Sequence, residues 1–188
     1  MKIPIEVSAR HVHLSKKDFE KLFGKNKSLS FLRKLSQPDE FGCKEVVEII
    51  GSKNKIENVR VIGPFRKSSQ LEISLTDAYN LKLKPLPRIR LSGNLLNVSK
   101  VLVKGPRGSV RIPCIIAKRH LHCSVKEAEQ LRIKNKQKVF VKILGIRKVI
   151  FGEIVVRVSE NYKLYLHLDT DEGNAGGIFK KTFGELIK

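Results

Sequence analysis

The sequence is poor in cysteine and in aromatic residues, and it contains no long apolar run. Its three cysteines, Cys43, Cys114 and Cys123, are odd in number and lack C-x-x-C spacing, so we expect reduced thiols rather than disulfides or a zinc finger. No segment approaches the roughly 18 consecutive apolar residues that a membrane-spanning helix needs. The N-terminal segment Met1–Ile5 lacks the apolar region of a secretory signal. These absences predict a cytoplasmic protein with no membrane partner.

Acidic residues are also scarce: the chain has 18 Asp and Glu residues and 38 Lys and Arg residues, which gives a net charge of +20. One interpretation is a nucleic-acid-binding protein whose basic side chains neutralise phosphates. The basic residues are spread along the whole chain, however, and the 6% of aromatic residues show no RNA-recognition pattern. A second interpretation is that the charge attracts a small polyanionic substrate. We therefore do not expect nucleic-acid binding to be the main function.

An internal repeat organises the chain, because residues 3–15 are echoed in register by residues 112–124. Each copy opens with an apolar strand-like segment and continues into a His-x-His pair, His11 with His13 and His120 with His122. In an extended strand, alternate residues lie on one face, so each pair is expected to point the same way. The chain therefore consists of two related halves.

The same local pattern follows both histidine pairs. Ser15 and Ser124 are expected to be N-caps of helices at Lys16–Phe23, closed by Gly24, and at Val125–Leu131. Short strands are expected at Glu45–Ile50, Asn58–Ile62, Gln70–Leu75, Lys100–Val103, Ser109–Ile116, Lys138–Ile143, Val149–Val158 and Lys163–Leu168. Many short strands with few helices predict a mostly β protein with two pseudo-repeated small β-barrel domains.

The histidines form a candidate metal-binding set. Only His167 lies outside the two pairs, and the corresponding position of the first half holds Glu72. Each half thus offers two histidines on one strand and a third nitrogen or oxygen ligand on a later one, which is typical of a catalytic zinc site with an open position. A single His-x-His is more often a coincidence, but its repetition in register favours metal. Such ligands suit zinc, and cobalt or iron also fit.

Three arginines accompany these residues. Arg10 and Arg119 each precede a histidine pair, where they either support the site or bind phosphate, or else are solvated. Arg66 lies in a basic loop six residues before Glu72 and is placed to bring a phosphate toward that ligand. A turn arginine facing water is the alternative, and the sequence does not decide between the two.

Six blocks of sequence along nearly the whole chain carry a family resemblance. They are Arg10–Ser15, Leu35–Pro38, Asn58–Arg66, Gln70–Ser74, Arg119–His122 and His167–Ala175. With these motifs the chain resembles the zinc-dependent phosphate propanoyltransferases of propanediol utilisation.

The resemblance implies two intertwined β-barrels with a dinuclear metal site between them. Residues 10–117 would form the first barrel, including a lid segment at about 24–44, and residues 118–188 the second, completed by strand 1–9. One metal would be held by His11, His13 and Glu72 and the other by His120, His122 and His167. Arg66 would be the catalytic, phosphate-binding arginine, and Gln37 and Pro38 would belong to the substrate-binding loop.

The implied activity is the interconversion of acyl-CoA and phosphate with acyl-phosphate and coenzyme A, the acyl group being acetyl or propanoyl. The resemblance also implies two divalent metals, coenzyme A as substrate, a homo-oligomer, and an acetate or propionate kinase as partner. The chain departs from the family pattern at Asp39, where glycine is usual, and at Asn94, where aspartate is common. It also shows no microcompartment-targeting extension before Ile3, which favours a free cytoplasmic enzyme.

The chemistry needs phosphate to attack a thioester carbonyl while a thiolate leaves. Since every histidine belongs to the expected metal ligands, no Ser-His-Asp or Cys-His arrangement is evident, and we expect direct transfer without a covalent acyl-enzyme. Two alternatives stay open: a metal-dependent hydrolase, and a basic nucleic-acid-binding protein with structural metals. The amidohydrolase barrel, which also begins with His-x-His, needs about 250 residues and many more helices.

Overall fold

The computed structural model describes residues 2–187, which form two compact units. The first barrel comprises Arg10–Leu35 and Asp39–Ala117, and the second comprises the N-terminal residues through Ala9, Ser36–Pro38 and the residues from Lys118 onward. The prediction of a mostly β protein with two small barrels and short helices is confirmed. Within the described residues, no helix is long and apolar enough to cross a membrane.

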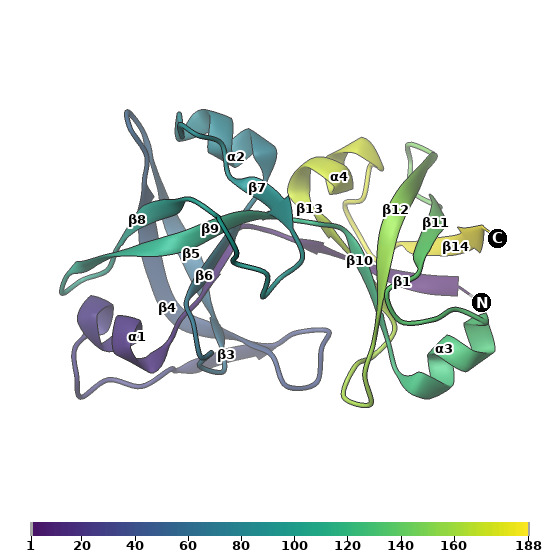
Figure 1. The fold of residues 1–188 in the computed structure, drawn as a ribbon, viewed down its shortest axis with the longest axis horizontal. Helices are drawn as coiled ribbons and strands as arrows, with labels where there is room; N and C mark the ends of the chain where they lie inside the picture. Colours follow the sequence, from purple (N-terminus) through teal and green to yellow (C-terminus); the bar gives the residue numbers. More distant parts are fainter. Residues whose placement is uncertain (1, 188) are drawn as a thin grey trace. The chain divides into compact units, whose positions relative to one another are not determined.

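Six strands close the first barrel in the order β4-β5-β2-β6-β9-β8, with β8 pairing back onto β4. Two further strands, β3 (Phe31–Lys34) and β7 (Arg88–Arg90), pair with β4 and β9 at the rim. The bounds of the barrel strands are β2 His11–His13, β4 Phe41–Ile50, β5 Lys55–Gly63, β6 Gln70–Ile73, β8 Lys100–Lys104 and β9 Ser109–Ala117. Figure 1 shows these strands in purple to green.

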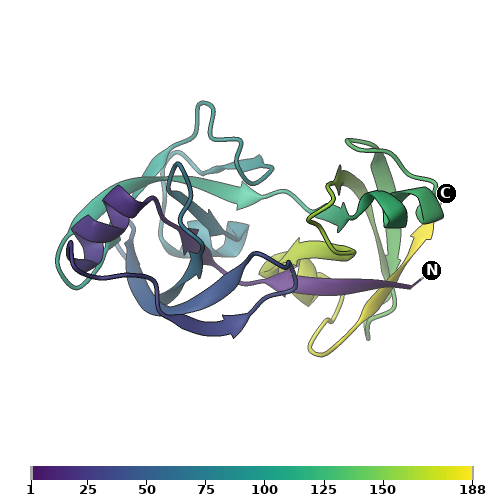
Figure 2. The ribbon, with the colours of Figure 1, turned by 90° about the horizontal axis from the view of Figure 1, so that it is seen from below.

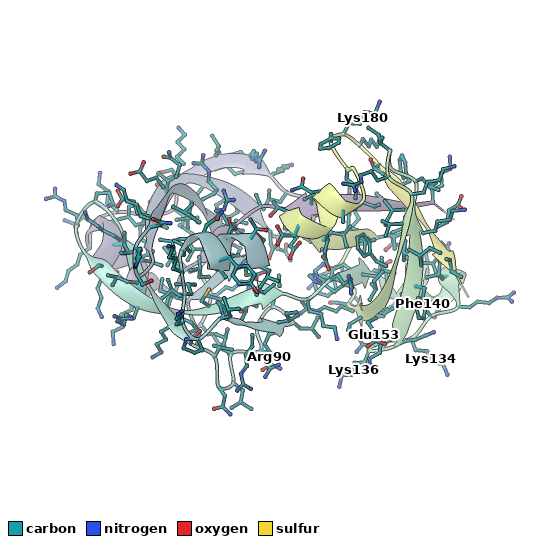
Figure 3. The ribbon with its side chains drawn as sticks, turned by 90° about the horizontal axis from the view of Figure 1, so that it is seen from above. Arg90, Lys134, Lys136, Phe140, Glu153 and Lys180 are labelled. Carbon is teal, nitrogen blue, oxygen red and sulfur yellow. The ribbon has the colours of Figure 1, made fainter. Side chains whose placement is uncertain are left out.

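The second barrel is also closed by six strands, in the order β1-β13-β10-β12-β11-β14. Their bounds are β1 Lys2–Ser8, β10 His120–Cys123, β11 Lys138–Ile143, β12 Val149–Val158, β13 Tyr165–Asp169 and β14 Phe183–Ile187. β11 shows why the sequence forms this barrel: Val139 and Val141 enter the core, while Phe140 between them is 52% exposed. Figure 3 shows Phe140 on the outside of the barrel.

The two barrels have matching topology, and each receives the first strand of the other half. In the second barrel, β10 is parallel to β12 and antiparallel to β13, and in the first barrel β2 is parallel to β5 and antiparallel to β6. β1 pairs with β13 and β14, although it precedes β2 in the chain (Figure 2). β9 pairs with β6 and β8, although it precedes β10. The strand before each histidine pair thus completes the opposite barrel.

Four short helices follow strands, and local capping explains where they begin. α1 (Lys16–Phe23) and α3 (Val125–Leu131) start at Ser15 and Ser124, whose hydroxyls accept hydrogen bonds from backbone N–H groups three residues later. Both predicted caps and the closing Gly24 are confirmed. Such a cap stabilises a helix by about 1 kcal/mol.

Two helices were not expected from the sequence, α2 (Leu75–Asn80) and α4 (Thr170–Ala175). The prediction of a strand through Leu75 is wrong, because Ser74 ends β6 by capping α2. Its hydroxyl accepts from the Asp77 N–H while the Asp77 carboxylate accepts from the Ser74 N–H. Asp169 and Glu172 form the same capping box at α4.

Each barrel has its own hydrophobic core. The first contains Phe19 and Leu22 from α1 together with inward-facing strand residues such as Val61, and the second is built around residues such as Leu121 and Ile154. All three cysteines are free thiols buried in these cores, as the sequence led us to expect. The cores hold the histidine-bearing strands β2 and β10 in place.

Candidate metal centres

The first barrel brings His11, His13 and Glu72 together. The antiparallel pairing of β2 with β6 places His11 directly opposite Glu72, and His13 lies two residues along the same face. The Nε2 atoms of His11 and His13 lie 3.8 and 3.9 Å from the two carboxylate oxygens of Glu72. All three side chains are buried, and one ligand atom from each lies within 4.8 Å of the others.

The second barrel repeats this arrangement with His120, His122 and His167. The pairing of β10 with β13 places His120 opposite His167, as β2 and β6 place His11 opposite Glu72. The rings of His120 and His167 stack with centroids 5.0 Å apart, and His122 meets His167 edge-on at 4.8 Å. Their ligand atoms also lie within 4.8 Å of one another.

The donor atoms of both clusters fit a metal ion. Within residues 2–187, three buried ring nitrogens have no hydrogen-bond partner: Nδ1 of His13 and both nitrogens of His122. A buried polar atom without a partner is costly, and a metal ion would satisfy it. His120 Nδ1 lies 2.9 Å from the Lys118 carbonyl oxygen, which fixes its proton there and leaves the Nε2 lone pair for coordination.

Burial keeps two of these imidazoles neutral, which is the form that binds metals. It lowers the pKa of His13 well below the usual value, and the charges of His11 and Arg66 act in the same direction. Burial also lowers the pKa of His122, again reinforced by its neighbours, first His120 and then His167.

A polar network supports Glu72. Ser92 donates its hydroxyl to Glu72 Oε1 at 2.8 Å, and the Gln70 side-chain amide donates to the same oxygen. Gln70 is held in turn by the Gly93 N–H, which donates to its Oε1 at 2.8 Å. Sequence reasoning missed the roles of Ser92 and Gln70, because Ser92 lies 20 residues from Glu72 in the chain.

Arg66 lies beside this network. Its backbone N–H donates to the Leu14 carbonyl at 2.9 Å, and its Nη1 donates to Ser92 Oγ at 3.0 Å. Its Nη2 forms an ion pair with Glu40 at 2.9 Å. Arg66 therefore reaches Glu72 through one hydroxyl, and it also meets a carboxylate that sequence reasoning did not consider.

The surroundings of the second cluster differ from those of the first. Buried Gln37 is fixed by two hydrogen bonds with the Lys163 backbone, and its Nε2 lies 3.3 Å from His167 Nε2. Glu6 Oε2 lies 3.7 Å from the other ring nitrogen of His167. The Tyr162 ring stacks on His122 with centroids 4.0 Å apart. Of the expected loop residues, Gln37 thus contacts a cluster histidine, whereas Pro38 is exposed.

Arg10 and Arg119 have equivalent partners. Arg10 donates to Asp77 at 2.6 and 2.9 Å, and Arg119 donates to Glu172 at 3.0 Å. These carboxylates belong to the capping boxes of α2 and α4. Arg10 therefore links the start of β2 to α2, and Arg119 links the start of β10 to α4.

The two departures from the family pattern lie at the surface. Asp39 and Asn94 are both exposed. The Asn94 N–H donates to the Leu91 carbonyl at 3.0 Å, and its side-chain oxygen accepts from the Leu96 N–H at 3.4 Å, so it is a turn residue. Within residues 2–187, neither side chain forms a hydrogen bond or an ion pair with a cluster residue.

Several known proteins with similar sequences share one description. The family model for phosphate propanoyltransferase matches residues 4–179. A phosphate propanoyltransferase of Clostridioides difficile is 43% identical over 99% of this chain and 89% of its own length. Proteins of the same name from Thermotoga maritima and Listeria monocytogenes are 45% and 40% identical, over 92% and 99% of this chain and 83% and 87% of their own lengths.

Proposed function

The chain belongs to the phosphate propanoyltransferase family, and we propose that it transfers an acyl group between coenzyme A and inorganic phosphate at a site that contains metal ions. The observation that carries the metal part of this proposal is the repetition of one buried ligand geometry, in the same strand register, in both barrels. A coincidental histidine pair would not recur with a matched third ligand.

Two divalent metals would be bound in each chain. His11, His13 and Glu72 would hold one, and His120, His122 and His167 the other. Three nitrogen or oxygen ligands leave a coordination position for substrate, and this donor set suits zinc, with cobalt or iron as alternatives. When bound, the metals would supply Lewis-acid chemistry that polarises the thioester carbonyl oxygen and stabilises the departing sulfur.

Arg66 is the proposed catalytic residue that binds phosphate. Its guanidinium carries a permanent charge and a planar set of donors that match a phosphate group. The hydrogen bond to Ser92 and the backbone contact to Leu14 hold it near Glu72 without making it a metal ligand. Gln37 and Pro38 are proposed to contact substrate from the loop before β4.

The proposed reaction is a direct transfer. An oxygen of hydrogen phosphate forms a bond to the acyl carbon, the carbon–sulfur bond breaks, and the phosphate proton ends on the sulfur of coenzyme A. A cysteine nucleophile is disfavoured, since burial raises the pKa of Cys43 and Cys123 to about 11 and raises that of Cys114 as well. All five histidines lie in the two clusters, so none is left to activate a serine.

The name of the relatives favours propanoyl as the acyl group, and acetyl is the alternative. A homo-oligomer and an acetate or propionate kinase that uses the acyl-phosphate are part of the same proposal. The proposed domain division, residues 10–117 against 118–188 with strand 1–9, is supported by the two compact units, except that Ser36–Pro38 group with the second.

Thiol release from propanoyl-CoA and acetyl-CoA, with and without phosphate, tests this function. Metal-loaded protein should release thiol only when phosphate is present and should form acyl-phosphate in equal amount. Thiol release without phosphate would instead identify a hydrolase. Nucleic acid that stays with the protein through purification and binds with a steep salt dependence would favour the basic binding protein.

A further inference from the structure

Glu40 is fixed next to Arg66 by the pairing of β4 with β5. Phe41, the first residue of β4, is the register partner of Gly63, the last residue of β5. The Phe41 ring lies so close over Gly63 that a Cβ there would stand 2.4 Å from it. The Glu40 carbonyl also accepts a hydrogen bond from the Leu35 N–H at 3.3 Å. The residue before Phe41 must therefore lie beside the loop that leaves Gly63 and carries Arg66.

The resulting ion pair occupies one end of the Arg66 guanidinium. Glu40 Oε1 lies 2.9 Å from Nη2, while Nη1 donates to Ser92 at 3.0 Å. The side chains of Arg66 and Glu40 remain 30% and 33% exposed. Ser92 thus holds one end of the guanidinium, and the partly exposed Glu40 carboxylate covers the other.

We propose that Glu40 competes with inorganic phosphate for Arg66 and thereby sets the affinity of the enzyme for phosphate. This inference rests on the proposed role of Arg66. A carboxylate and a phosphate use the same guanidinium donors, so phosphate binds Arg66 fully only after Glu40 has moved aside. An exposed ion pair is weak, which makes Glu40 displaceable, yet its negative charge still opposes an arriving anion.

Competition and anchoring make opposite predictions for the removal of the Glu40 charge. If Glu40 competes, its neutral analogue leaves more of Arg66 available, and phosphate binds more tightly. If Glu40 instead holds Arg66 in position, the same change lets the side chain move, and phosphate binds less tightly. The contacts of Arg66 with Ser92 and Leu14 supply anchoring on their own, which favours competition.

Kinetics of Glu40→Gln and Glu40→Ala with phosphate varied at saturating acyl-CoA provide the test. We expect the KM for phosphate to fall about three- to tenfold, which is the size of a weak ion pair plus nearby charge repulsion. The KM for coenzyme A in the reverse direction should stay unchanged. Asp39→Asn is the matched control, because it removes the same charge from the neighbouring exposed residue and should change the phosphate KM by less than twofold.

A double-mutant cycle with Arg66→Ala separates this inference from the proposed role of Arg66. If Arg66→Ala alone leaves the phosphate dependence unaltered, Arg66 does not bind phosphate. The proposed competition by Glu40 is then also wrong. If Arg66→Ala weakens phosphate binding but Glu40→Gln raises the phosphate KM or leaves it unchanged, only the competition is overturned. The proposal requires that Glu40→Gln lower the phosphate KM in the native background and have a smaller effect in the Arg66→Ala background, where only the charge repulsion is left to remove.

Discussion

Ser92 donates its hydroxyl hydrogen to the Glu72 carboxylate at 2.8 Å, and the Ser92 hydroxyl oxygen accepts a hydrogen bond from Arg66 at 3.0 Å. One side chain thus orients a proposed metal ligand and holds the proposed phosphate-binding residue. Groups that hold metal ligands in place commonly change metal affinity ten- to a hundredfold when they are removed.

Ser92→Ala should therefore weaken metal binding at the first cluster by about tenfold and leave the second cluster unaffected. Gln70 still donates to Glu72 in this variant, so a larger loss is not expected. Competition with a chromogenic chelator measures both affinities. Ser109→Ala, at an exposed serine of the same barrel, is the control. Equal metal affinities in Ser92→Ala and the native protein would show that Ser92 does not support the metal site.

Arg66→Ala should keep its metal content and fold but lose phosphate-dependent activity. The lost charge-assisted contact contributes roughly 1.5–3 kcal/mol, which corresponds to about a ten- to hundredfold fall in kcat/KM for phosphate. Arg66→Lys keeps the charge but loses the planar donor set, so it should recover only part of the activity. Kinetics with varied phosphate, alongside metal analysis, measure this. An Arg66→Ala enzyme with native phosphate kinetics would contradict the assignment.

The parts of the fold that sequence reasoning predicted depend on local chemistry. The caps at Ser15 and Ser124 are visible because a serine hydroxyl serves a backbone N–H only three residues away. The bounds of β11 and β12 agree with the prediction because valine and isoleucine alternate or cluster there. The short helices α2 and α4 have no apolar periodicity, and only their capping boxes could have indicated them.

The parts of the site that sequence reasoning missed depend on pairing between distant segments. Glu40 meets Arg66 because Phe41 is in register with Gly63, and no local pattern encodes that register. Ser92 reaches Glu72 from an irregular segment after β7. The histidine clusters were predictable because duplication displayed the same pattern twice. Single residues without a repeat, such as Glu40, Ser92 and Tyr162, gave no such signal.

Metal analysis should find about two divalent ions per chain, since each barrel holds a group of three side chains that could bind a metal ion. His13→Ala and His122→Ala should each lower the content to about one, from different barrels, and the double variant should bind none. Because a metal that binds only the folded state adds about 2.7 kcal/mol at a hundred times its Kd, chelation should lower the Tm. Replacement of Lys134, an exposed lysine of the second barrel (Figure 3), should change neither quantity. Native metal content in both single variants would refute the ligand assignment.

Glu172 should make folding stability depend on pH. Burial raises the pKa of its carboxyl from 4.5 to about 7, and the nearby Asp169 adds to this, although Arg119 and a backbone N–H favour the charged form. Because the folded-state pKa lies above the unfolded-state value, the stabilising contribution is present below about pH 4.5. It is lost as the pH rises through about 7, and at 1.36 kcal/mol per pKa unit it amounts to at most about 3 kcal/mol.

Glu172→Gln removes the titration while keeping the shape of the side chain. The free energy of unfolding of this variant, relative to the native protein, should therefore rise by up to about 3 kcal/mol between pH 4.5 and pH 8. Urea unfolding of both proteins at several pH values, with metal removed by a chelator, measures the difference, and titrations common to both cancel. A difference that stays constant with pH would show that the ion pair with Arg119 offsets the effect of burial, and a difference that falls as the pH rises would show that the ion pair dominates.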